Sequence, residues 1–110
     1  MPTDALVILT TLASEEEAVA FVRALLERRL VACGTILPAA RSLYRWEAQL
    51  SDEREAVVLL KSTAGRLDDL AEAFTELHPY KVPELLALPV EAGLEKYLRW
   101  IGGETARSEG

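Results

Sequence analysis

The sequence is poor in the residues that build covalent or metal-based frameworks. Its 110 residues include one cysteine, Cys33, and one histidine, His78. A single cysteine excludes an intrachain disulfide framework and is typical of a reducing compartment. The sequence also lacks a histidine pair, a Gly-x-Ser-x-Gly motif and a phosphate-cradling glycine loop. No motif therefore supports catalysis, and we predict that the protein is not an enzyme.

Blocks of basic residues and long apolar runs are missing as well. The net charge is −6 and the pI is near 4.8, which oppose attraction to nucleic acid or anionic lipid. No segment approaches the roughly 18 consecutive apolar residues that span a bilayer. The first four residues, Met1–Asp4, lack the positive region of a secretory signal. We therefore predict a cytoplasmic protein without nucleic-acid or membrane partners.

Apolar residues, by contrast, are abundant for so short a chain. Hydrophobic residues make up 50% of it, while its length suits one domain and one core. A small monomer needs more polar surface than this, so part of the apolar area is expected to be buried against other copies. We predict a single domain over residues 1–101 and a flexible polar tail over residues 102–110.

Hydrophobic periodicity predicts alternating strands and helices. The expected strands cover residues 5–11, 30–37, 42–50, 55–63 and 84–90, and the expected helices begin at Ser14, at Thr63 and near Leu94. Pro38 is expected to stop the second strand. The polar residues 51–54 predict the turn of a long antiparallel hairpin. Pro79 should end the second helix by His78, and Pro89 indicates that the last strand lies at a sheet edge.

This order, β-α-β-β-α-β followed by a helix, predicts an α+β fold of the ferredoxin-like, split βαβ kind. Its antiparallel sheet carries helices on one face only. The opposite face holds too many leucine, valine and aromatic residues for contact with water. We therefore expect that face to pack against other subunits in a homo-oligomer.

The segment from His78 to Glu84 is the strongest candidate site in the sequence. Its two prolines favour an ordered, extended connector that presents an imidazole, a phenol, an ammonium and a carboxylate. His78 and Glu84 could act as an acid–base pair, although only their proximity in sequence supports that role. A structural role for His78, ending the helix and binding its last carbonyls, is equally compatible with the sequence.

Other reactive residues each have a structural alternative. Cys33 could bind metal across a subunit interface, with His78 and carboxylates, or could be a small buried core residue. Lys61 could bind an anion or extend from a strand end into solvent. The aromatic residues Tyr44, Trp46, Tyr97 and Trp100 could line a pocket or anchor an interface.

Several motifs of the chain resemble those of the CutA family, the divalent-cation tolerance proteins. The matching runs are Glu27–Cys33, Pro38, Ser42–Glu47, Leu60–Thr63, His78–Glu84 and Tyr97–Ile101, in the order of the family. The resemblance extends from about residue 5 to residue 101. It implies a ferredoxin-like subunit in a tight homotrimer, similar to the PII signalling proteins, with hairpins that pair between neighbours and clefts between subunits.

The resemblance also implies tolerance of divalent metals and weak binding of copper or another divalent cation. By motif match, the metal-ligand candidates are Cys33, His78 and Glu84, while the residues around the inter-subunit cleft are Tyr44, Trp46, Lys61, Tyr80, Tyr97 and Trp100. The alternative function is a PII-like module that binds a small anionic ligand in these clefts, with a small-molecule or protein partner that the sequence does not identify.

The sequence departs from the family pattern at three places. Gly34-Thr35 replaces the Val-Asn that follows the cysteine in many members, and Ala48-Gln49 replaces the Gly-Lys that follows the Trp-Glu pair. Thr10-Thr11 stands where some members carry another cysteine. These changes weaken the expectation of a thiol-rich copper site and leave the expected trimer untouched.

Overall fold

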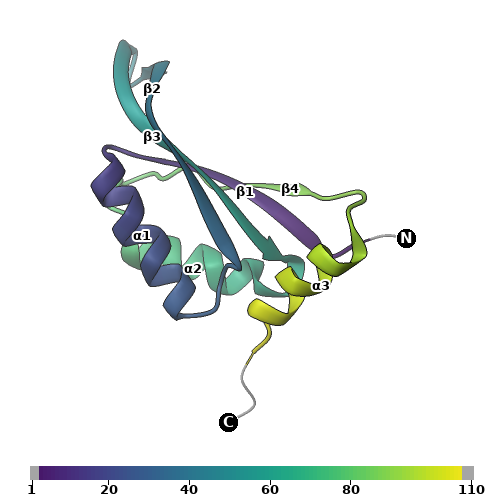
Figure 1. Ribbon diagram of the computed structural model, residues 1–110. Coiled ribbons are helices and arrows are strands. Elements are labelled where there is room, and N and C mark those ends of the chain that lie inside the picture. The colour runs from purple at the N-terminus through teal and green to yellow at the C-terminus, as the bar shows by residue number, and fades with distance from the viewer. Residues whose placement is uncertain (1–2, 108–110) are drawn as a thin grey trace.

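The computed structural model describes residues 3–107 and shows a sheet with α1 and α2 beneath it (Figure 1). The elements in chain order are β1 (Ala5–Leu12), α1 (Glu15–Glu27), β2 (Cys33–Trp46), β3 (Gln49–Thr63), the 3₁₀ turn η1 (Ala64–Arg66), α2 (Leu67–Leu77), β4 (Leu86–Pro89) and α3 (Glu95–Glu104). None of the helices formed by residues 3–107 has the length and apolar character needed to cross a membrane.

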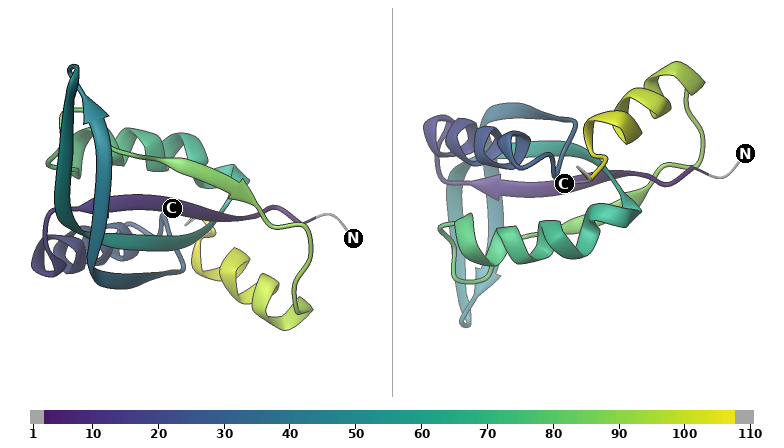
Figure 2. Two further views of the ribbon diagram at one scale, coloured as in Figure 1. Left: turned by 90° about the horizontal axis from the view of Figure 1, so that it is seen from above. Right: turned by 90° about the horizontal axis from the view of Figure 1, so that it is seen from below.

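The four strands form one antiparallel sheet in the order β2-β3-β1-β4. The predicted α+β, ferredoxin-like arrangement is confirmed, and β4 is an edge strand as Pro89 indicated. Both α1 and α2 lie on the same side of the sheet, which the view from below shows nearest the viewer (Figure 2). The other side of the sheet, which we call the open face, carries neither α1 nor α2.

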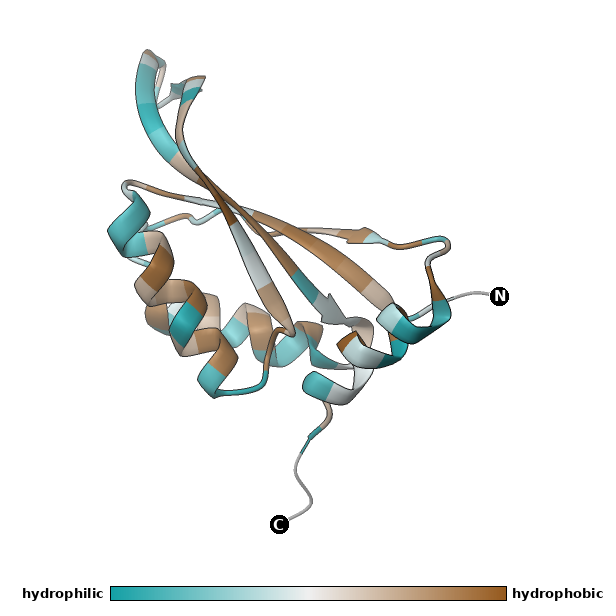
Figure 3. Ribbon diagram, in the orientation of Figure 1, coloured by the Kyte–Doolittle hydropathy of each residue, from teal (hydrophilic) through white to brown (hydrophobic). Residues whose placement is uncertain are grey.

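The core lies between the sheet and these two helices. Helix α1 begins where predicted, because the Oγ of Ser14 accepts a hydrogen bond of 3.1 Å from the backbone N–H of Glu17. Successive side chains of β1 and β3 point alternately toward the helices and toward the open face. Ile8 and Leu60 point toward the helices and are fully buried. Figure 3 shows apolar colouring through β1 and the middle of β2 and β3, and polar colouring toward the tip of the hairpin.

The hairpin turn lies at Glu47-Ala48 and not at residues 51–54, so the predicted turn is wrong. Both turn residues have positive φ, 49° and 65°, as the two-residue turns of tight hairpins require. Residues 51–54 instead continue β3 and pair with residues 41–44 of β2. These residues are polar because they belong to an exposed two-stranded arm. A polar run in an exposed strand resembles a turn in the sequence, so the turn was predicted there.

Pro38 does not end the second strand, contrary to prediction. It lies in a bulge between Leu37 and Ala40, where Ala39 has φ of 56°, and β2 continues beyond it to Trp46. A bulge leaves a residue out of the ladder, so a proline that cannot donate a hydrogen bond is tolerated there.

The second helix and the C-terminal region also differ from the predicted boundaries. A 3₁₀ turn separates Thr63 from α2, and the hydroxyl of Thr63 lies 3.2 Å from that of Thr105 without making a cap hydrogen bond. Helix α3 continues to Glu104, and Thr105 is buried. The expected tail therefore does not begin at residue 102, and residues 108–110 lie outside the described part of the chain.

Candidate functional site

His78 caps the C-terminus of α2 and is buried. Its backbone N–H donates to the carbonyl oxygen of Phe74 at 2.9 Å, so the residue ends the helix as one of the two interpretations predicted. Its ring packs edge-on against Phe21, with the two ring centroids 5.0 Å apart, and at a tilt against Tyr80, with centroids 4.9 Å apart. The imidazole therefore belongs to the helix-facing core.

Both ring nitrogens of His78 are engaged in hydrogen bonds. Nδ1 accepts from the backbone N–H of Tyr80 at 3.1 Å, so Nε2 carries the proton and donates to the carbonyl oxygen of Thr11 at 2.9 Å. Burial lowers the pKa of His78, although the hydrogen bond to Thr11 and the charge of Glu17 oppose the shift. In this neutral form the imidazole has no free lone pair for a metal or a substrate proton.

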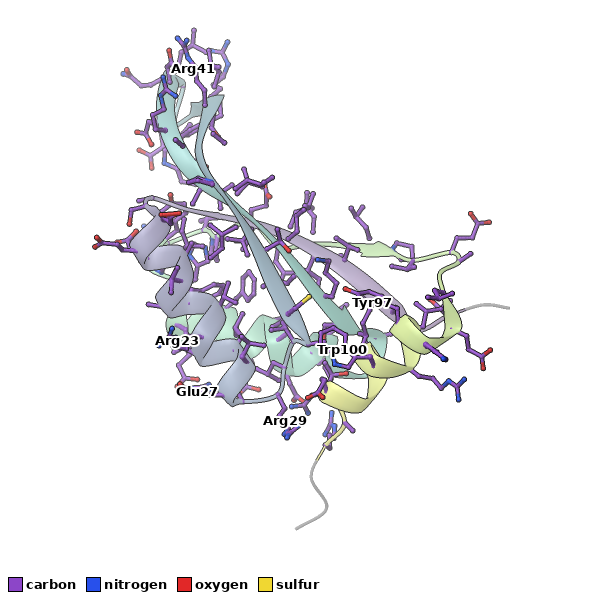
Figure 4. All side chains as sticks on the ribbon, in the orientation of Figure 1. Arg23, Glu27, Arg29, Arg41, Tyr97 and Trp100 are labelled. Atoms are coloured by element: carbon purple, nitrogen blue, oxygen red, sulfur yellow. The ribbon has the colours of Figure 1, made fainter. Side chains whose placement is uncertain are left out.

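Cys33 lies on the open face of the sheet. It pairs with Lys61, whose Nζ lies 3.8 Å from the Cys33 Sγ, and the hydroxyl of Tyr97 on α3 lies 3.9 Å from the same sulfur. Burial, followed by the contact with Cys33, raises the pKa of Tyr97. The rings of Tyr97 and Trp100 lie side by side on α3 at an angle of 33°, with centroids 5.5 Å apart (Figure 4). Cys33 is half-buried, so its thiol is not sealed within the core.

The three metal-ligand candidates do not converge within one subunit. Lys61, beside Cys33, pairs with Val7, whereas His78 binds Thr11, four residues or about 13 Å farther along β1. His78 also lies on the helix side of the sheet. Glu84 is exposed on the connector. Residues 3–107 contain no group of three His, Cys, Asp or Glu side chains placed to hold a metal, so they do not fit a metal centre within a single chain.

The predicted cleft residues fall into two groups. Tyr44, Trp46 and Tyr80 line one cavity of about 770 Å³, which we call the hairpin cavity. Its other lining residues are Thr11, Ala13, Arg41, Ser42, Leu43, Glu53, Glu55, Lys81, Val82 and Glu84. Lys61, Tyr97 and Trp100 lie instead toward the opposite end of β3, near Cys33 and α3.

Glu53 and Glu55 are the important residues of the hairpin cavity that the sequence interpretation missed. Glu55 is only 7% exposed, and its Oε2 accepts a hydrogen bond of 3.3 Å from the Oγ of Ser42. Glu53 accepts one of 3.0 Å from the hydroxyl of Tyr44. Alternation along β3 places both carboxylates on the open face, and this periodicity was the available signal.

The hairpin cavity has a negative electrostatic environment. Burial, followed by the charges of Glu55 and Glu17, raises the pKa of Tyr80 to about 12. The hydrogen bond to Glu53 raises the pKa of Tyr44. Arg41 also lines the cavity, but its Nε and Nη2 bind the two carboxylate oxygens of Asp52 at 2.9 and 2.8 Å. The cavity therefore presents more negative than positive charge.

Comparison with known proteins identifies the relatives of this chain. The family described as CutA1 divalent ion tolerance protein matches residues 6–104. A relative named Divalent-cation tolerance protein CutA, from Pectobacterium atrosepticum, is 45% identical over 98 residues, which cover 89% of each chain. A solved divalent cation tolerance protein from Thermus thermophilus is 40% identical, with a TM-score of 0.89 over 93% of this chain and 99% of that one.

A solved CutA1 from Oryza sativa is more distant in sequence and equally close in fold. It is 31% identical and has a TM-score of 0.91, over 97% of this chain and 98% of that one. The likeness thus covers the hairpin, the connector and α3 together. The chain belongs to the CutA1 family of divalent ion tolerance proteins.

Proposed function

We propose that this protein is a cytoplasmic homotrimer that contributes to tolerance of divalent cations, copper among them, by weak cation binding and without catalysis. Membership of the family carries this proposal, because the relatives are named for divalent-cation tolerance. The direct test is deletion of the gene followed by growth in graded copper concentrations. Loss of growth at concentrations that the parent strain tolerates supports the proposal, whereas unchanged growth contradicts it.

The open face of the sheet supports assembly into an oligomer. Leu37, Leu86 and Leu88 all point to this face and are 50%, 54% and 47% exposed. Between them lie the half-buried side chains of Val7, Leu9, Val57 and Leu59. A contiguous apolar surface of this kind is typical of an interface between subunits.

The hairpin supports the same assembly. Beyond the last pair of β1 and β3, Leu12 with Ala56, the arm formed by residues 41–46 and 49–54 has no strand partner outside itself among residues 3–107. Two-stranded arms are weakly stable alone, and their unpaired edges can accept a strand from a neighbour. Sedimentation equilibrium at micromolar concentration should give the mass of a trimer, and a monomer mass would contradict it.

Cation binding, on this proposal, involves ligands from more than one copy. Cys33 is a soft ligand on the open face, while His78 and Glu84 lie elsewhere in the same chain. A competition titration with a copper chelator should show weaker Cu(I) and Cu(II) binding for Cys33→Ser than for wild type. Glu84→Gln tests the exposed carboxylate in the same way. Equal affinities for wild type and both variants would remove these residues from the proposed site.

A second candidate function is binding of a small anionic ligand near Lys61. The Nζ of Lys61 lies 3.3 Å from the Oγ1 of Thr35, and none of the ion pairs within residues 3–107 includes it. A panel of nucleotides and carboxylates should then raise the melting temperature of wild type but not of Lys61→Met. Absence of any shift with wild type would reject this function.

A further inference from the structure

The hairpin cavity contains a buried carboxylate, that of Glu55, which forms no ion pair within residues 3–107. Glu55 is only 7% exposed, and its side chain has one hydrogen bond among the described residues, from Ser42 to Oε2. The ion pairs within residues 3–107 include neither Glu55 nor Glu53 nor Glu84. Because a charge removed from water is costly unless it is paired, Glu55 is suited to a cation supplied from outside the chain.

The cations near the cavity do not fill this role. The guanidinium of Arg41 is held by both carboxylate oxygens of Asp52, and the Arg54 Nη1 donates to the carbonyl oxygen of Ala39 at 3.4 Å. Lys81 lines the cavity but is exposed on the connector. Glu55 is therefore the one buried charge among the lining residues, and none of the ion pairs within residues 3–107 includes it.

Three aromatic side chains also line the hairpin cavity. Tyr44 and Trp46 come from β2, and Tyr80 comes from the connector, so the rings approach from different elements. Ring faces attract cations through their quadrupoles, and the attraction strengthens when water is excluded. Aromatic side chains and a buried carboxylate that line the same cavity form a surface complementary to an ammonium group on an apolar body.

We propose that the hairpin cavity binds an organic ammonium ligand, with Glu55 as its charge partner and Tyr44, Trp46 and Tyr80 as its aromatic walls. A bare divalent metal fits less well, because Mg²⁺ and Ca²⁺ prefer six or more oxygen ligands and residues 3–107 offer no group of three acidic, histidine or cysteine ligands for any metal. A small anion meets the repulsion of Glu53 and Glu55. This site lies away from Cys33, and the proposal does not depend on the tolerance function, although Glu84 lines the cavity as well.

The binding test uses isothermal titration calorimetry on the assembled full-length protein with three probes. Phenethylammonium combines the charge and the apolar body, butylammonium lacks the ring, and 3-phenylpropanoate reverses the charge. Wild type should bind phenethylammonium more tightly than butylammonium and should not bind the carboxylate. No heat with either amine, as expected if a neighbouring subunit fills the cavity, or preference for the carboxylate overturns the proposal.

Two variants assign the binding to the cavity. Glu55→Gln preserves the shape but removes the charge, and should weaken phenethylammonium binding about tenfold or more. Trp46→Leu alters a side chain that is 49% exposed, so the fold is retained, and should weaken binding about threefold. Glu72→Gln makes the same chemical change on the exposed side of α2 and should leave affinity unchanged. Equal affinity for wild type, Glu55→Gln and Trp46→Leu would place any amine elsewhere and reject the site.

Discussion

The Nε2 of His78 lies 2.9 Å from the carbonyl oxygen of Thr11, which ties the C-terminal cap of α2 to the end of β1. The Nδ1 of the same ring holds the backbone N–H of Tyr80, the first of the connector residues that line the hairpin cavity. One imidazole thus joins a helix, a strand and a connector. Its main role is to position the connector.

Replacement of His78 should therefore reduce stability. His78→Ala removes a packed ring and leaves the carbonyl of Thr11 without its donor, so we expect a loss of about 2–4 kcal/mol in the free energy of unfolding. His78→Gln, which can still donate to that carbonyl, should lose less. Urea unfolding at fixed protein concentration measures both, and Lys81→Ala on the exposed connector is the control. Equal stability of His78→Ala and wild type would contradict this role.

The stability should also depend on pH through His78. Burial lowers its folded pKa below the ordinary value of 6.5, so the unfolded chain binds the proton more readily. The full contribution is present above pH 6.5 and decreases as the pH falls through the folded pKa, with Glu17 and Tyr80 as the groups that face the ring. Urea unfolding from pH 8 to 5 should show a larger loss for wild type than for His78→Gln. Parallel curves for the two proteins would contradict the shift.

Gly34 allows close contact between β2 and α1. A Cβ at this position would lie 2.6 Å from the Cγ1 of Val22, which is too close for the buried interface to accept without movement. Gly34→Ala should therefore lower the free energy of unfolding by about 1–3 kcal/mol. Gly65→Ala adds the same methyl group where no heavy atom lies within 4 Å and should be close to neutral. Thermal and urea unfolding compare the two, and equal effects would reject the steric explanation.

The sequence predicted the elements whose signals are local. The Ser14 cap, the first strand and the end of α2 at His78 all follow from short motifs, and the structure confirms them. The hairpin turn was missed because Glu47-Ala48 contains neither Gly nor Asn, the residues that usually adopt positive φ.

The composition of the candidate site depends on a bulge that the sequence did not reveal. Odd-numbered residues of β2 from Cys33 to Leu37 lie on the open face. The extra residue at the Pro38-Ala39 bulge reverses this alternation, so beyond it the even-numbered residues Ser42, Tyr44 and Trp46 lie on the open face. Glu55 joins them only because of this register. The cavity is a consequence of strand pairing and of the connector crossing near it, and neither can be determined from spacing alone.

The hairpin turn holds an alanine in a strained backbone conformation. Ala48 has φ of 65°, where a Cβ is unfavourable and glycine is not, so Ala48→Gly should raise the free energy of unfolding by about 1 kcal/mol. Ala71→Gly makes the same change at an exposed position inside α2 and should lower stability by about 1 kcal/mol, because glycine is unfavourable in a helix. Urea unfolding of the two variants should therefore give effects of opposite sign. A loss of stability in both would show that the turn is not strained at Ala48.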